Sequence, residues 1–95
     1  MVTHVVLFKL KDRGDQSIAQ SKSRLETLAG QIPSLRSIEI GTDIIRSSRS
    51  YDLALIGRFD DLSGLEAYQA HPVHQPVTDY LRSVSESIIA VDFES

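Results

Sequence analysis

The spacing of hydrophobic positions changes from one segment of the chain to the next. Residues 3–10 form a short run rich in β-branched and aromatic side chains, which predicts a strand. A turn with Asp12, Gly14 and Asp15 follows. Residues 16–31 then space their apolar side chains by about one helical turn, and Pro33 comes directly after the last of them. The positions that predict this helix are Ile18, Leu25, Leu28, Ala29 and Ile32.

Two further strands are predicted in the middle of the chain. Residues 36–45 carry four isoleucines, at positions 38, 40, 44 and 45, and predict the second strand. The polar stretch Arg46–Ser50 predicts a hairpin loop, and residues 51–59 predict the third strand.

Helical spacing returns after residue 60 and is broken once. Asp61 or Ser63 can cap a short helix, because Ser63 and Glu66 have capping-box spacing. A second helix is expected from about Pro76, since proline suits a first helical turn. Its apolar positions recur at i, i+3, i+4 and i+7, namely Val77, Tyr80, Leu81 and Val84. Residues 86–94 predict the last strand.

The predicted order is βαββαβ, with the second helical region divided in two. This is an α+β arrangement of the ferredoxin-like kind, with a four-stranded antiparallel sheet. Right-handed crossovers place the helices on one face of that sheet. With 95 residues and no internal repeat, the chain is expected to be a single domain over residues 1–95.

The strands are apolar on both faces, although the helices can cover only one. In the last strand, Ile89, Val91 and Phe93 oppose Ile88 and Ala90. An uncovered second face would expose more apolar surface than soluble monomers usually tolerate. A second copy of the chain is the simplest cover, and a partner protein of different sequence is the alternative. We therefore expect a homodimer formed through the open sheet face.

Composition excludes several classes of protein. The net charge is −3 and the ten basic residues are scattered, which argues against a nucleic-acid partner. The chain has no cysteine, so disulfides and thiolate chemistry are excluded, and this fits a cytoplasmic location. The apolar run Val5–Phe8 is too short for a signal segment or a membrane span.

Two segments resemble the stress-responsive dimeric α/β-barrel (Dabb) family. They are the opening strand His4–Leu10 and the Tyr-x-x-His-Pro-x-His segment from Tyr68 to His74, and the similarity extends over the chain. The resemblance implies a ferredoxin-like protomer whose sheets pack face to face as a dimeric α/β barrel. The family includes plant proteins associated with stress, uncharacterised bacterial proteins and a few cofactor-free polyketide cyclases.

In the cyclases, a tyrosine and a histidine of this segment act in a pocket between helices and sheet. By position the resemblance assigns these catalytic roles to Tyr68 and His74, with His4 and His71 as ligand-binding neighbours. A neutral histidine could remove a proton next to a carbonyl, and a tyrosine could stabilise the enolate that forms. A helix beginning near Pro76 would favour the neutral form of His74.

Each of these residues also has a structural interpretation. Tyr68 could be an aromatic residue at the edge of the core, and His4 a buried core or interface histidine. His71, before a proline, could bind free backbone groups between the two helices. A metal site of all three histidines is disfavoured, because Pro72 disrupts the spacing that would aim two of them at one ion.

The sequence thus leaves two functional hypotheses. The first is a homodimer that binds a small, largely apolar or aromatic molecule, with acid/base chemistry as a cyclase, isomerase or lyase. This chemistry requires no cofactor and no metal, and no phosphate-binding or nucleophile motif is present. The second is a non-catalytic stress-response or structural homodimer.

Overall fold

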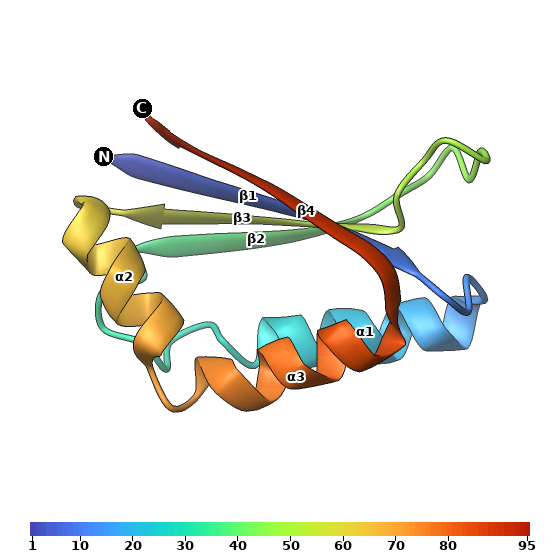
Figure 1. Ribbon diagram of the computed structural model, residues 1–95, viewed down its shortest axis with the longest axis horizontal. Helices are drawn as coiled ribbons and strands as arrows, with labels where there is room; N and C mark the ends of the chain where they lie inside the picture. Colours follow the sequence, from blue (N-terminus) through green and yellow to red (C-terminus); the bar gives the residue numbers. More distant parts are fainter.

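The computed structural model describes residues 1–95 and confirms the ferredoxin-like order of elements (Figure 1). The strands and helices are β1 (Val2–Leu10), α1 (Asp15–Glu26), β2 (Ser37–Thr42), β3 (Leu53–Phe59), α2 (Leu62–Ala70), α3 (His74–Val84) and β4 (Ser85–Glu94). The antiparallel sheet has the order β2-β3-β1-β4, so that the first strand lies inside the sheet and the last at its edge.

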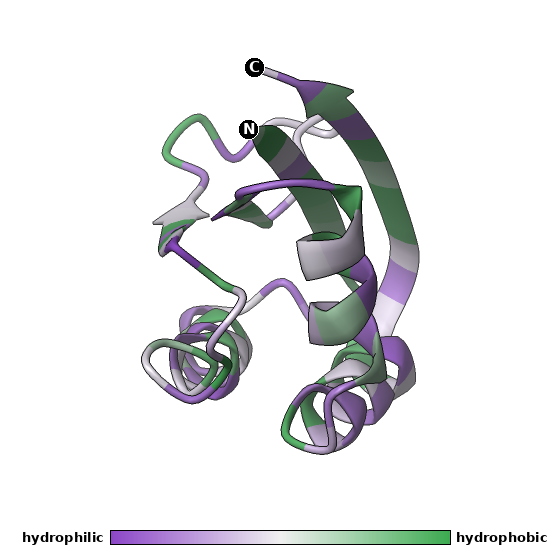
Figure 2. Cartoon of the chain, turned by 90° about the vertical axis from the view of Figure 1, so that its left-hand side faces the viewer, coloured by the Kyte–Doolittle hydropathy of each residue, from purple (hydrophilic) through white to green (hydrophobic).

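The molecule has two layers, a sheet and a layer of helices on one of its faces (Figure 1). In Figure 2 the two long helices separate, with α3 on the side of β4 and α1 on the side of β2. The N- and C-termini lie side by side, because β1 and β4 are paired antiparallel along their length. None of the helices is long and apolar enough to cross a membrane.

Alternation along β1 divides its side chains between the two faces. The face toward the helices carries His4, Val6, Phe8 and Leu10, all buried. These side chains join one core with apolar residues of β3 and of all three helices. The β1 residues between them point to the opposite face, where no helix lies.

The open sheet face is also apolar. Val5 and Leu7 of β1 pair with Val91 and Ile89 of β4, so these side chains share that face. Ile89, Val91 and Phe93 are 47%, 57% and 48% exposed. Figure 2 shows the hydrophobic positions along β4 as green bands. The predicted apolar second face is therefore present and uncovered in the single chain.

The first helix is shorter than residues 16–31. It ends at Glu26, and the chain then continues in turns up to Gln31, with Gly30 at a φ of +74°. This left-handed conformation suits glycine and does not continue a helix. Leu28 and Ile32, which were predicted on the helix face, still reach the core from the turns.

The prediction that Ile44 and Ile45 belong to the second strand is wrong. β2 ends at Thr42, and the two isoleucines are 88% and 74% exposed. The backbone N–H of Arg46 donates to the Asp43 side chain over 2.6 Å, and Arg46 has a φ of +62°. A local turn thus replaces the strand, and the next strand begins at Leu53 rather than at residue 51.

The second helical region consists of two helices, α2 and α3. Asp61 caps α2 by accepting a hydrogen bond from the N–H of Gly64 at 2.9 Å, and Ser63 donates to Asp61 instead of capping. α3 begins at His74 rather than Pro76, so that Pro76 lies within its first turn.

A buried carboxylate organises the end of the sheet opposite the chain termini. Asp52 is fully buried and accepts hydrogen bonds from Leu10 N–H at 2.7 Å, Arg13 at 2.9 Å and Arg46 at 2.9 Å. Burial by itself raises the pKa of Asp52, but the hydrogen bonds from Leu10, Arg13 and Arg46 outweigh it and hold the pKa below 3.8. The carboxylate joins β1, the following turn and the loop before β3.

Replacement of Asp52 by Asn should lower the free energy of unfolding by about 2 kcal/mol at neutral pH. The amide can still accept from Leu10, but Arg13 loses its ionic partner and Arg46 keeps only the longer contact with Asp43, at 3.7 Å. Because the folded-state pKa is lowered, the charge stabilises the fold above pH 3.8 and its contribution disappears as pH falls through the folded value. Urea unfolding at one fixed protein concentration should show the difference from wild type shrinking between about pH 5 and 2. If the difference in unfolding free energy stayed constant over this interval, the stabilising role of the charged Asp52 would be contradicted.

Candidate functional site

A cavity of about 380 Å³ lies on the helix side of the sheet, next to β4. Most of its wall is apolar, from the sheet, α1 and α3: Val6, Phe8, Leu25, Leu28, Leu55, Val77, Leu81, Ile88 and Ala90. Its remaining lining residues can hydrogen-bond: His4, Tyr68, Gln69, His74, Thr78 and Arg82. An apolar pocket with a few polar groups is the usual form of a small-molecule site. A second depression between α1 and α3, about 540 Å³ in volume, is open and polar and contains none of the predicted site residues.

Tyr68 brings its hydroxyl to this cavity. Its side chain lies on the core-facing side of α2, and the residue is 1% exposed. The ring packs against Phe59 with centroids 5.1 Å apart. Burial raises the pKa of Tyr68 to about 12, so the phenol keeps its proton at neutral pH. No hydrogen bond within the chain involves this hydroxyl, which leaves it free to donate to a molecule in the cavity.

His74 lies next to Tyr68 at the start of α3, with the ring centroids 4.5 Å apart. Burial lowers the pKa of His74 below 6.5, and the nearby positive charge of Arg82 acts in the same direction. The Thr78 hydroxyl is 3.2 Å from Nδ1 and 3.3 Å from Nε2. The imidazole is therefore neutral near pH 7 and able to accept a proton.

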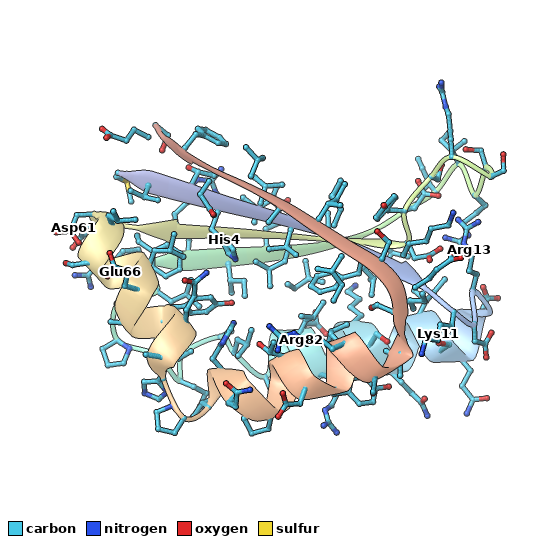
Figure 3. The ribbon with its side chains drawn as sticks, in the orientation of Figure 1. His4, Lys11, Arg13, Asp61, Glu66 and Arg82 are labelled. Atoms are coloured by element: carbon cyan, nitrogen blue, oxygen red, sulfur yellow. The ribbon has the colours of Figure 1, made fainter.

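His4 faces the same cavity from the sheet, and Figure 3 shows it pointing from β1 toward the helices. Its ring lies 6.0 Å from that of Tyr68, between centroids. Nδ1 of His4 forms a short hydrogen bond with the carboxylate of Asp92, its direct neighbour on β4. Since a carboxylate accepts, the Nδ1 atom carries the proton, and the Asp92 carboxylate fixes the orientation of the ring.

His71 does not line the cavity with the other three predicted residues. Its Nδ1 atom accepts a hydrogen bond from the N–H of Val73 at 3.1 Å, at the junction of α2 and α3. The backbone of His71 is extended, with a φ of −68° and a ψ of 138°, before Pro72. The three histidines do not converge, and no group of three His, Cys, Asp or Glu side chains is arranged to hold a metal ion.

Sequence reasoning missed four polar residues of this region, Gln69, Thr78, Arg82 and Asp92. Asp92 interrupts the apolar run of the last strand, and only the pairing of β4 with β1 reveals that it meets His4. Thr78 and Arg82 follow His74 at intervals of four residues on α3, which places all three on one side of the helix. That spacing was visible in the sequence.

Comparison with known proteins places this geometry in a family. The Stress responsive A/B Barrel Domain (Dabb) family matches residues 2–95. The chain belongs to the Dabb family. It is 34% identical to an uncharacterised protein from Streptomyces coelicolor, over 99% of each chain. A stress-response A/B barrel domain-containing protein of Arabidopsis thaliana is 28% identical, over 95% of this chain and 82% of its own length.

Solved structures agree with the Dabb fold. A dimeric ferredoxin-like protein from Thermobifida fusca has a TM-score of 0.87 at 27% identity, over 99% of this chain and 90% of its own. One from Bacteroides fragilis has a TM-score of 0.83 at 32% identity, over 99% and 95%. Both are of unknown function. At 16% identity the fold alone is shared with a hydroxynitrile lyase from Passiflora edulis and a cofactor-independent oxygenase from Streptomyces nogalater, with TM-scores of 0.81 and 0.78.

The His74 environment predicts an acidic titration. In an NMR pH titration, the His74 ring should change protonation below pH 6.5, and Arg82→Gln should move that change slightly upward by removing a positive charge. Because its folded-state pKa is lowered, His74 does not affect stability well above pH 6.5 and destabilises the fold as pH falls below that value. A titration at or above pH 6.5 would contradict the buried, neutral imidazole.

Proposed function

We propose that this Dabb domain acts as a homodimer that binds a small, largely apolar or aromatic carbonyl compound in the cavity beside β4. We further propose cofactor-free acid/base chemistry there, of the cyclase, isomerase or lyase type. The observation that carries this proposal is the contact of a neutral imidazole, His74, with a partner-free phenol, Tyr68, in an apolar cavity.

The proposed step is a proton transfer at carbon. A nitrogen of His74 takes a proton from the carbon next to the substrate carbonyl, and the C–H electron pair moves to give an enolate. The Tyr68 hydroxyl donates a hydrogen bond to the enolate oxygen, where the negative charge develops. The enolate carbon can then bond to a second carbonyl in an aldol-type ring closure, and the alkoxide that forms takes the proton back from the imidazolium. Alternatively, the imidazolium returns the proton to the substrate at another position.

The apolar wall supports this chemistry. A cavity of about 380 Å³ is large enough for a compound of one or two rings. Residues such as Leu55 and Leu81, each 2% exposed or less, exclude water and strengthen the hydrogen bond to the developing charge. His4, oriented by Asp92, offers a second imidazole to the same cavity and is proposed to help hold the ligand.

The homodimer is supported by the uncovered sheet face and by the dimeric relatives. The apolar side chains of β4 on this face are 47% to 57% exposed in the single chain. Related ferredoxin-like proteins at 27% and 32% identity are dimeric. Two open faces packed against each other would remove these side chains from water and give the dimeric α/β barrel.

A non-catalytic homodimer is the second candidate. It is favoured by the packing of Tyr68 against Phe59, since a ring in this position also stabilises the core. In that case the cavity would bind a ligand without turnover, or none, and the dimer itself would be the functional unit.

Turnover can be tested without knowledge of the natural substrate. The purified protein is incubated in D₂O with acetophenone, propiophenone or benzylacetone, and exchange of the hydrogens next to the carbonyl is followed by NMR. Wild type should exchange them faster than buffer. Tyr68→Phe and His74→Ala should each lower the enzymatic rate by about 100-fold or more, because each removes one partner of the proton transfer. Both variants should keep the wild-type dimer and circular dichroism spectrum.

Two results would contradict the catalytic proposal. One is full exchange activity in both variants. The other is no exchange by wild type with any of the three ketones, together with variants that only lower the free energy of unfolding. The second result would favour the structural homodimer.

The open face makes a separate prediction. Val91→Asp should raise the dimer dissociation constant by at least about 100-fold, because two-fold symmetry places the new charge in the interface twice. Leu62→Asp is the matched control, since Leu62 is 59% exposed at the start of α2, away from the sheet face. Analytical ultracentrifugation measures the dimer dissociation constants of both variants. A wild type that is monomeric at micromolar concentration would contradict the homodimer.

A further inference from the structure

Polar residues form a line along the cavity side of α3. His74, Thr78 and Arg82 all line the cavity, and their spacing of four residues places them on one side of the helix. The buried residues Val77 and Leu81 lie beside them and are 7% and 1% exposed. The cavity therefore has an apolar wall crossed by one polar line, which ends in a guanidinium group.

Arg82 has no ionic partner within the chain. It takes part in none of the salt bridges or side-chain hydrogen bonds, whereas Arg13, Arg36 and Arg46 are each paired with an aspartate. The carboxylate of Asp92 is bound by His4. A guanidinium carries donors in a planar fork that fits a carboxylate, so a free one beside a ligand cavity is suited to an anionic group.

Among lysine, arginine, aspartate and glutamate, only one residue lines the cavity. Arg82 is the one lysine or arginine among the lining residues, and no aspartate or glutamate lines the cavity. The whole chain, by contrast, carries a net charge of −3. An acidic ligand would gain nothing from the overall field of the protein, and its charge could be compensated only at this position.

We infer that the ligand is an amphipathic acid, with an apolar or aromatic body and a carboxylate that is bound by Arg82 at the solvent end of the cavity. This inference rests on the proposed function, because it concerns the same cavity. Arg82 is exposed, and Figure 3 shows it on the side of α3 nearer the sheet, while His4 points toward the helices from above. The apolar body would lie along Val77 and Leu81.

This arrangement also orients the ligand. Arg82 follows His74 by eight residues, which corresponds to a rise of about 12 Å along the helix. A carboxylate bound by the long side chain of Arg82 would leave the other end of a molecule of one or two rings near His74 and Tyr68. Arg82 would thus decide which carbon meets the proposed base.

Three probes of similar shape, which share a phenylethyl group attached to a carbonyl carbon, separate the effect of charge from that of shape. Hydrocinnamate is an anion, whereas hydrocinnamamide and benzylacetone replace its carboxylate by a neutral amide and a methyl ketone. Calorimetric titration of the dimer at pH 8 and low salt should give hydrocinnamate a dissociation constant about tenfold lower than that of hydrocinnamamide. The preference should weaken at high salt, because Arg82 is exposed to solvent.

Variants at position 82 test whether Arg82 causes the preference for the anionic probe over the neutral ones. Arg82→Gln should remove it and leave the dissociation constants of hydrocinnamamide and benzylacetone unchanged within about twofold. Arg82→Lys should keep part of it, because the charge remains without the planar fork. Arg49→Gln is the matched control, because it makes the same change of charge at an exposed loop residue outside the cavity and should behave as wild type.

The outcomes distinguish this inference from the proposed function. Equal binding of all three probes by wild type, or an acid preference that persists in Arg82→Gln, would overturn the role of Arg82 and leave a neutral-ligand cavity. Failure of all three probes to bind wild type would overturn both the cavity ligand and the role of Arg82.

Discussion

Hydrophobic side chains occupy both faces of the sheet, but the chain supplies helices for only one, and the rest of the structure follows from this constraint. Successive side chains of β4 point alternately to the cavity and to the open face of the sheet. Ile88 and Ala90 point inward and line the cavity, while Ile89 and Val91 point outward to the open face. β4 is an edge strand, paired with β1 alone. A partner packed on the open face would hold this strand in place and with it one wall of the cavity. In the proposed dimer, the backbone of this one strand would couple the interface to the cavity.

Two carboxylates bind to β1 and differ in burial: Asp52 is fully buried, whereas the Asp92 side chain is 41% exposed. Near the C-terminal end of β1, the carboxylate of Asp52 accepts hydrogen bonds from a backbone N–H and from two arginines. It thereby joins three segments of the chain. Near the other end, His4 is bound by Asp92, but the polar groups around it are incompletely paired. The Tyr68 hydroxyl has no partner in the chain and Arg82 has no counter-ion. Groups that stabilise a fold are usually satisfied within it. A ligand in the cavity could supply partners for the Tyr68 hydroxyl and the Arg82 guanidinium, which both line it.

The sequence was sufficient for the features that depend on local periodicity. Apolar residues at successive positions in the strands over residues 3–10 and 86–94 predicted two apolar faces, and the spacing of Val77 and Leu81 predicted the buried side of α3. Features that depend on distant residues were not accessible. His4 and Asp92 are 88 positions apart, and only strand register brings them together. Ile44 and Ile45 look like strand residues, but the Asp43–Arg46 turn removes them from the sheet. The resemblance pointed to Tyr68, His74, His4 and His71 as neighbours, and the fold gathers the first three at the cavity and leaves His71 at a helix junction.

The two candidate functions make different demands on position 68. For a purely structural role, phenylalanine would fill the same space against Phe59 without a hydroxyl. His74 is held by the Thr78 hydroxyl beside its ring, and burial lowers its pKa and thereby opposes its charged form. The packing against Phe59 makes no use of the phenol hydroxyl. A cavity that receives a carbonyl compound would use both groups, because the ligand completes the hydrogen bond of the phenol and presents a proton to the imidazole. The phenol hydroxyl without a partner in the chain therefore favours a binding or catalytic role over a purely structural one.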